Sequence, residues 1–521
     1  MVMEQFSGER VVSSLPALII LAPFVASIIV FFLTRYRVKL GEYFTIGTIA
    51  LMFVAIFSLY DTVKAGNVIF SRFEFFSIPF PIYFRMDSLS FFLCLLIAFL
   101  WLIASIHSIG YMAKEHAHER YYSFLLIALA GCMGTVFAGD LLGLFVFFEI
   151  MALSSYVLIA HEEHPYAMFA GAKYLFMSVG AGLAIFFGMM ITYHLAGTLT
   201  LDGFGLIQEV STLSLAAFIG YLLGFGVKAG IFPVHIWLPD AHPAAPSPVS
   251  ALLSGVMIKV GAYGLIRVFY QVYGFEYLHA LGWDQIALVL STITILLGSA
   301  LALLQDDLKK RLAYSSIAQI GYIVLGISLL SERAFTGALY HIFSHAFMKG
   351  CLFLIAGALI VKAGERRISY LGGIGRKMPI TMIAFTICSL SMVGIPPFNG
   401  FISKWQLSLG ALDIGQPFYV GLLILSSLLN SAYYFPIVVT AFFGTPKAEE
   451  EAAASREDTA APEPAPSSNS QKNNLKLSEA PLSMLIPISI LAVGCVLFVL
   501  LPQNWPLDLA KIIVQELFVS F

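Results

Sequence analysis

The chain has 521 residues, of which 59% are hydrophobic and 12% are charged, and its formal net charge is −2. A soluble domain of this length normally carries about twice that charged fraction, so the composition excludes a water-soluble globular protein and indicates a polytopic membrane protein. The near-neutral charge gives no indication of nucleic-acid binding.

Apolar runs of roughly 20 residues, the length that crosses a bilayer as a helix, recur along the whole chain. The first run, 15–33, lacks a small-residue cleavage site, so we interpret it as a retained helix and not as a signal peptide. The predicted fold is an all-α polytopic membrane protein with about 14 transmembrane helices. In chain order these spans are expected near 15–34, 42–63, 86–110, 121–138, 141–160, 168–195, 214–238, 247–272, 284–304, 311–330, 334–361, 379–411, 417–443 and 482–501.

Two of these spans contain helix breakers beside a lysine. The span 379–411 holds Gly394, Pro396 and Pro397 shortly before Lys404, and Lys228 precedes a second Gly–Pro-containing break. Interrupted segments in matching positions of two halves are typical of inverted-repeat transporters. We expect N-terminal helices 1–3 in 1–120, a first repeat of helices 4–8 in 121–272, a second repeat of helices 9–13 in 284–443, a flexible cytoplasmic linker in 446–480, and the last helix with a C-terminal tail in 481–521.

Basic residues concentrate in the short loops that follow odd-numbered spans, for example Lys309, Lys310 and Arg311. Loops after even-numbered spans hold few basic residues, and Arg85 is one of the exceptions. Because Lys and Arg favour the cytoplasmic side, we expect both termini to lie outside the cytoplasm.

The five cysteines all lie inside apolar runs, and no two of them share a metal-ligand spacing. We therefore expect no iron–sulfur, haem c or zinc site, and no cofactor, in this chain.

Charged residues recur where lipid would otherwise surround the chain. Glu149, Lys228 and Lys259 lie within or at the end of apolar spans, and Lys404 follows the break described above. A charge at the bilayer centre costs about 2.5–3.5 kcal/mol on insertion scales, so such residues usually face a bundle interior or a wet cavity. Glu149 and Lys228 are candidates for a couple in which pairing favours the charged forms and burial favours the neutral forms. A purely structural role for isolated buried lysines is the alternative.

Three further titratable residues, His341, His345 and Lys349, are spaced i, i+4, i+8 in one span. On an α-helix this spacing places them on one face, along about 12 Å of helix rise. A row of histidine and lysine side chains, bridged by ordered water, is suited to stepwise proton transfer. Interior histidines that are simply satisfied by hydrogen bonds are the alternative.

The segments "FVFFEIMALSSYVLI", "KAGIFPVHIWLPDAHPAAPSPVSALLSGVMIKVGAYGLIR", "QDDLKKRLAYSSIAQIGYIVLGI" and "GIPPFNGFISKW" resemble the antiporter-like subunits of the respiratory complex I superfamily. They are most similar to the D-type subunits of Mrp sodium/proton antiporters and to their counterparts in membrane-bound, energy-converting hydrogenases. The resemblance implies fourteen helices, two inverted five-helix repeats, and broken helices 7 and 12. It places Glu149 on helix 5 beside Lys228 on helix 7, Lys259 on helix 8, the two histidines on helix 11 and Lys404 on helix 12.

The resemblance also implies that this chain does no redox chemistry and carries protons, with sodium left open, as one member of a larger assembly in a prokaryotic cell membrane. Our leading hypothesis is a proton-translocating subunit of a hydrogenase-type or related ferredoxin-driven complex. The alternatives are the D-type subunit of an Mrp sodium/proton antiporter without a redox module, a stand-alone solute transporter, and a scaffolding subunit that has lost transport.

Overall fold

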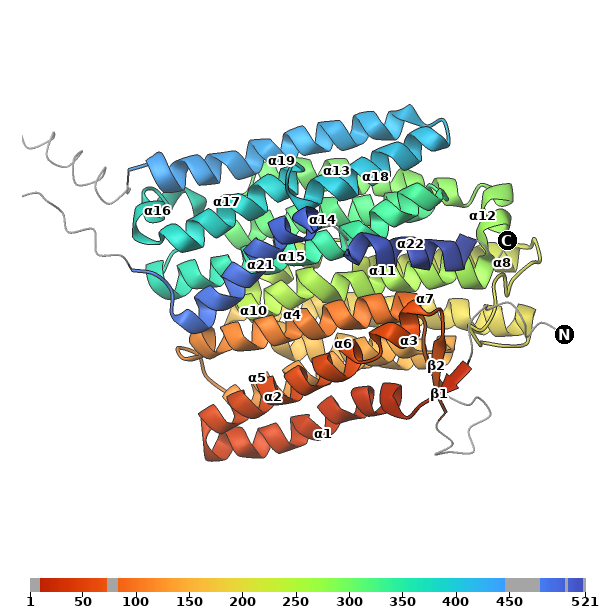
Figure 1. Ribbon diagram of the computed structural model, residues 1–521, viewed down its shortest axis with the longest axis horizontal. Helices are drawn as coiled ribbons and strands as arrows, with labels where there is room; N and C mark the ends of the chain where they lie inside the picture. The colour runs from red at the N-terminus through yellow and green to blue at the C-terminus, as the bar shows by residue number, and fades with distance from the viewer. Residues whose placement is uncertain (1–9, 73–82, 446–477, 502–504, 519–521) are drawn as a thin grey trace, which may run out of the picture.

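The computed structural model describes residues 10–72, 83–445, 478–501 and 505–518. Long helices run side by side through the whole bundle, as Figure 1 shows. Twelve of the described helices are long and apolar enough to cross a membrane, which confirms an all-α polytopic membrane protein. The count of about 14 spans and the inverted repeat stay predictions. The predicted linker 446–480 lies almost entirely outside the described residues.

The helices have the following bounds. They are α1 Leu15–Tyr36, α2 Val38–Phe57, α3 Tyr60–Lys64, α4 Ser88–Met112, α5 His118–Phe137, α6 Leu141–Ile159, α7 Pro165–Ala196, α8 Thr212–Ala229, α9 Leu238–Ala244, α10 Ser247–Leu252, α11 Ile258–Arg267, α12 Phe275–Leu281, α13 Asp284–Leu303, α14 Leu308–Ser328, α15 Glu332–Ala363, α16 Ile374–Lys377, α17 Pro379–Val393, α18 Asn399–Asp413, α19 Pro417–Phe443, α21 Leu482–Leu500 and α22 Trp505–Phe518. Two π-helical segments, η1 Leu253–Met257 and η2 Val268–Tyr273, flank α11, and η3 Ile368–Tyr370 is a 3₁₀ turn.

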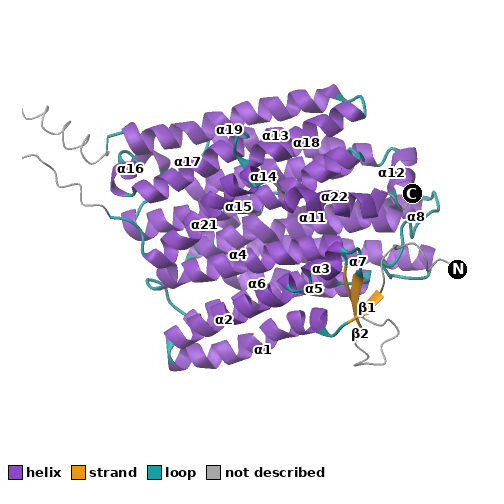
Figure 2. Cartoon of the chain, viewed as in Figure 1, coloured by secondary structure: helices purple, strands orange, loops and turns teal. Residues whose placement is uncertain are grey.

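A small sheet, which the sequence analysis did not predict, lies at one end of the bundle (Figure 2). It contains β1 Arg10–Val12, β2 Val68–Arg72 and β3 Tyr83–Met86, in that order. β1 pairs with β2 in parallel, and β2 pairs with β3 antiparallel. β1 and the end of α22 lie at the same end of the bundle (Figure 1). This agrees with an even number of spans, and the orientation relative to the cytoplasm stays a prediction.

Side chains and glycines at the helix ends fix where the long helices begin and stop. Asp87 and Asp140 each accept a hydrogen bond from a backbone N–H in the first turn of α4 and α6, which satisfies donors that the helix itself leaves free. α8 and α17 both end at a glycine in the left-handed region, Gly230 at φ 83° and Gly394 at φ 90°. The second glycine leads into the break between α17 and α18, next to the predicted site.

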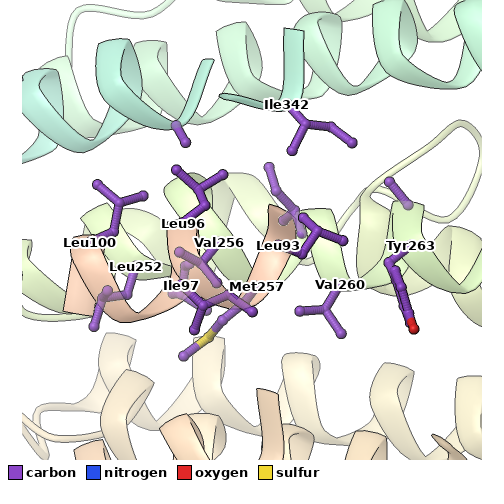
Figure 3. Packing of buried hydrophobic residues seen from close by; sticks show 14 of the residues in the cluster. Leu93, Leu96, Ile97, Leu100, Leu252, Val256, Met257, Val260, Tyr263 and Ile342 are labelled. Atoms are coloured by element: carbon purple, nitrogen blue, oxygen red, sulfur yellow. The ribbon is translucent and has the colours of Figure 1, made fainter. Parts of the chain in front are cut away.

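α15 is the central helix of the site and packs against α4, α14, α17, α18, α21 and α22. Figure 3 shows apolar side chains of α4 packed against those of α10, η1 and α11, with Ile342 of α15 opposite them. Leu93, Leu96 and Val256 are among these buried side chains. This tightly packed apolar layer fixes the relative positions of the helices that carry the polar residues.

Candidate functional site

The seven predicted site residues lie on five helices of the bundle. They are Glu149 on α6, Lys228 on α8, Lys259 on α11, His341, His345 and Lys349 on α15, and Lys404 on α18. Glu149 is half-buried, and the other six residues are at most 7% exposed. Because buried polar groups are nearly always hydrogen-bonded, the partners of each residue define its environment.

Glu149 and Lys228 lie near one another in the fold but do not form an ion pair within the described residues. Lys228 Nζ donates to Tyr174 Oη at 2.6 Å, and it lies 4.9 Å from the centre of that ring. Glu149 Oε1 has no hydrogen-bond partner among the described side chains. A Cβ at Gly182 of α7 would overlap with this oxygen, so the glycine leaves the space that the carboxylate occupies. The switchable coupling of Glu149 with Lys228 stays a prediction.

Lys259 follows directly after the π-helical segment η1. Its Nζ donates to the backbone carbonyl of Ser254 inside that segment. The Ser254 hydroxyl lies 2.7 Å from the Ser316 hydroxyl of α14, so hydroxyl groups of two helices lie close to the lysine's acceptor. π-Helical turns are rare and are frequently found at functional sites, which fits the position of η1 next to this lysine.

His341 and His345 stack their rings along one face of α15, as the i, i+4 spacing predicts. The ring centres are 5.8 Å apart and the planes differ by 7°. His341 Nδ1 lies 2.9 Å from Ser403 Oγ on α18. His341 Nε2 and both ring nitrogens of His345 have no hydrogen-bond partner in the part of the chain that the structure describes. These three buried nitrogens are positions where a bound water is expected.

Lys349 continues the row one turn further along α15. Its Nζ donates to the Leu312 carbonyl at 2.8 Å and to the Tyr434 hydroxyl at 3.0 Å. Tyr434 Oη lies 3.0 Å from Ser315 Oγ. The lysine is therefore connected to hydroxyl groups on α14 and α19.

Lys404 lies in the second turn of α18, and its side chain reaches back to the end of α17. Its Nζ donates to the carbonyls of Met392 and Val393 and to Ser427 Oγ, each at 2.9 Å. The last carbonyls of a helix have no intrahelical donor and carry partial negative charge, so the end of α17 is a suitable acceptor for an ammonium group. A Cβ at Gly394 would lie 2.8 Å from Lys404 Cδ, which explains why the chain has a glycine there.

This chain is similar in sequence to known protein families. Residues 138–430 match the family described as NADH:quinone oxidoreductase/Mrp antiporter, TM. Residues 73–122 match the family described as NADH-Ubiquinone oxidoreductase (complex I), chain 5 N-terminus. The first match covers more than half of the chain and includes every predicted site residue. The chain belongs to this antiporter family.

Three relatives illustrate the range of the family. NADH-quinone oxidoreductase subunit N of Desulforudis audaxviator (strain MP104C) is 35% identical over 92% of this chain and 95% of its own length. The D-type subunit of the Na(+)/H(+) antiporter of Bacillus subtilis (strain 168) is 29% identical over 82% of this chain and 86% of its own. In the structure of the membrane-bound sulfane sulfur reductase (MBS), an archaeal respiratory membrane complex, one chain matches with a TM-score of 0.82 at 25% identity, over 97% of this chain and 98% of that one. The predicted resemblance to antiporter-like subunits of the complex I superfamily is confirmed.

This antiporter-like subunit has further buried polar residues that the sequence analysis missed. His242 of α9 is fully buried, stacks on Phe353 at 4.5 Å, and neither of its ring nitrogens has a hydrogen-bond partner within the described ranges. Lys309 was expected in a short loop, and that expectation is wrong: it lies in the first turn of α14, is 1% exposed, and donates to the Ala245 carbonyl. The burial of Lys309 could not be predicted from the sequence, because it stands beside Lys310 and Arg311, and three adjacent basic residues are typical of a solvated loop.

A buried ionic cluster, separate from the predicted site residues, lies where the small sheet meets α4. Arg267 donates to both oxygens of Asp87 at 2.8 Å, and Arg85 Nη2 lies 3.3 Å from Asp87 Oδ2. Burial alone would raise the pKa of Asp87, but the two guanidinium groups outweigh burial and hold the pKa well below its usual range. Arg85, which the sequence analysis placed in a loop, is 2% exposed. This cluster anchors β3 and α4 to α11.

Glu516 of α22 lies beside that cluster. Its Oε1 accepts a hydrogen bond from Ser88 Oγ at 2.6 Å. Burial raises the pKa of Glu516 to about 7, and the Ser88 hydrogen bond opposes this only in part. The C-terminal helix therefore brings a carboxyl group that titrates near neutral pH into the fold.

Proposed function

We propose that this antiporter-like subunit moves protons along the buried row of lysines and histidines. The observation that supports this most strongly is the kind of partner that the lysines have. Within the described residues, Lys228, Lys259, Lys349 and Lys404 all donate to hydroxyl or carbonyl oxygens and not to carboxylates. A buried lysine bound by neutral acceptors can gain or lose its proton without breaking an ion pair, as a relay requires.

The proposed order of transfer follows the helices. Glu149 and Lys228 form the first, switchable pair, and Lys259 is the central relay. His345 and His341, helped by Lys349, connect Lys259 with Lys404, which exchanges protons with one side of the membrane. Ordered waters bridge the gaps, and the histidine nitrogens without partners among the described residues support this.

The assembly that we propose is a multi-subunit complex in a prokaryotic cell membrane, with both termini of this chain outside the cytoplasm. The names of the relatives fit two possible energy sources for proton movement, a redox reaction and an ion gradient. The subunit of an NADH-quinone oxidoreductase supports a redox-driven complex, for which a hydrogenase-type or ferredoxin-driven enzyme is our first choice. The Na(+)/H(+) antiporter relative supports the alternative, an Mrp-type antiporter without a redox module.

The test is proton movement in proteoliposomes that contain the whole complex. We compare wild type with Lys259→Met, which removes the ammonium group and leaves an unbranched apolar side chain one heavy atom shorter. Lys362→Met, at an exposed lysine on the last turn of α15, is the matched control. Native gels confirm that each variant assembles. We expect Lys259→Met to abolish driven proton movement and Lys362→Met to leave it intact; intact pumping in assembled Lys259→Met complex would exclude Lys259 as a relay.

A further inference from the structure

A large apolar cavity lies on the side of α15 away from the histidine row. Its volume is about 700 Å³, within the range of cavities that hold small ligands, roughly 300–1,000 Å³. It is bounded by α2, α3, α4, α15, α21 and α22. None of the described residues that line it is charged, and the polar atoms of its lining side chains are those of Tyr60, Ser489 and Trp505. The lining therefore selects a hydrocarbon ligand.

The wall of the cavity is a rigid group of aromatic rings. Phe343 and Phe347 of α15 have ring centres 4.7 Å apart, and Phe498 of α21 lies 4.8 Å and 5.3 Å from them. Phe99 of α4 stacks on Phe347 at 5.3 Å. Rings that pack against one another in this way do not collapse into the space between the helices, so the cavity is preformed.

The cavity opens at the apolar outer surface of the bundle. Phe57 of α2 and Val493 of α21 line it, yet they are 54% and 56% exposed. Ile490 and Leu497, also on α21, line it and are exposed as well. The outward apolar faces of α2 and α21 thus lead from the bilayer directly into the cavity, and no charged residue of the described lining stands in the way of a lipid.

We propose that this cavity binds one acyl chain of a membrane phospholipid, which enters between α2 and α21. A transmembrane helix of a partner is about 10–12 Å wide with its side chains, which is too wide to enter a cavity already bounded by six elements. A quinone would need hydrogen-bond partners for its head, whereas the lining offers a uniform apolar surface to a chain. Moving an acyl chain from the bilayer into the cavity gives no hydrophobic gain, because both surroundings are apolar. The chain would instead be held by van der Waals contacts with the aromatic rings, which an empty cavity lacks.

Trp505 allows a direct test because it lines the cavity. The whole complex is reconstituted in phospholipid that carries bromine in the middle of its acyl chains, which quenches an indole on contact. The emission of Trp505 is obtained as the difference between wild type and Trp505→Phe. Trp405, which is 52% exposed on α18, is measured in the same way as a lipid-facing reference. Ser489→Phe adds a ring to the lining and so reduces the space that is open to an acyl chain.

We expect brominated lipid to remove most of the Trp505 emission, and Ser489→Phe to reduce this quenching while leaving the quenching of Trp405 unchanged. Unquenched Trp505 beside quenched Trp405 would overturn the proposal and would point to a partner subunit over the cavity. Quenching of Trp505 that is as strong in Ser489→Phe as in wild type would also overturn it, because the bromine would then reach the indole by a route that does not depend on the space in the cavity. The readout is fluorescence and not pumping, so this result is independent of the proposed proton transfer.

A phospholipid with a photoreactive group in its acyl chain provides a second measurement. We expect the label on peptides of α2 and α21 that contain Phe57 and Val493. Labelling that a long-chain quinone suppresses, and that excess phospholipid does not, would assign the cavity to a quinone tail and would contradict the phospholipid proposal.

Discussion

The contact between Gly394 and Lys404 gives a prediction that separates backbone strain from function. Gly394 has φ 90°, and a Cβ there would lie 2.8 Å from Lys404 Cδ. Gly415 has φ 69°, but a Cβ there would meet nothing within 4 Å. Gly394→Ala and Gly415→Ala therefore share the cost of a left-handed residue, about 1–2 kcal/mol. Only Gly394→Ala also displaces the lysine.

The size of the functional effect follows from the three hydrogen bonds of Lys404 Nζ, each 2.9 Å long. Losing one hydrogen bond to a charged group costs about 1.5–3 kcal/mol. Since about 1.4 kcal/mol is a factor of ten, the fraction of molecules with Lys404 in the observed position should fall roughly ten- to a hundredfold. We expect proton movement in proteoliposomes to fall with it.

The assay compares the two alanine variants at equal amounts of assembled complex. Both should lose similar stability against denaturation in detergent, and only Gly394→Ala should lose proton movement. If Gly394→Ala pumps as well as Gly415→Ala, the position of Lys404 against the end of α17 does not matter for transport, and the reasoning fails.

Three further predictions use the same kind of comparison. Gly182→Ala should impair proton movement, because its Cβ would overlap with a carboxylate oxygen of the row, whereas Gly180→Ala on the same helix meets nothing within 4 Å and should not. Arg267→Met should destabilise the subunit by about 1.5–3 kcal/mol in detergent denaturation, because Asp87 loses its hydrogen bonds from Arg267 and keeps Arg85 as its ionic partner; unchanged stability would contradict this account. Burial raises the pKa of Glu516 from 4.5 to about 7, because the buried carboxyl group favours its neutral form. The packing of α22 against the bundle should therefore be strongest at acidic pH and weaken as pH rises through 7. Hydrogen exchange of α22, corrected for intrinsic rates, should show this dependence in wild type and not in Glu516→Gln.

The membrane spans could be predicted from sequence because long apolar runs leave few alternatives to a transmembrane helix. The interruptions after α8 and α17 could be located for a similar reason, since Gly230 and Gly394 stand close to prolines in otherwise apolar segments. The three-stranded sheet could not be predicted, because its strands are only 3, 5 and 4 residues long and β1 pairs with a segment far along the chain. Short strands are stabilised by partners that sequence periodicity does not reveal.

The candidate site was predictable to the extent that charge is conspicuous in an apolar run. Lys228, Lys259 and Lys404 could be found in this way, and each of them is at most 7% exposed. Their function as one row stays a prediction. Their hydrogen-bond partners could not be found, because a tyrosine such as Tyr174 or a backbone carbonyl carries no unusual hydropathy. His242 was overlooked because a single histidine in a proline-rich segment does not stand out from a loop.

The carbonyl acceptors of Lys404 determine which contacts of this lysine amino-acid substitutions can remove. Two of its three acceptors are main-chain oxygens of Met392 and Val393, so they persist whatever side chains those positions carry. A mutational scan would therefore miss this role of residues 392 and 393, because changing their side chains leaves the two carbonyl acceptors in place. Replacing the amide that follows either carbonyl with an ester would weaken the acceptor itself. Such backbone chemistry would reveal a contribution that side-chain genetics cannot detect.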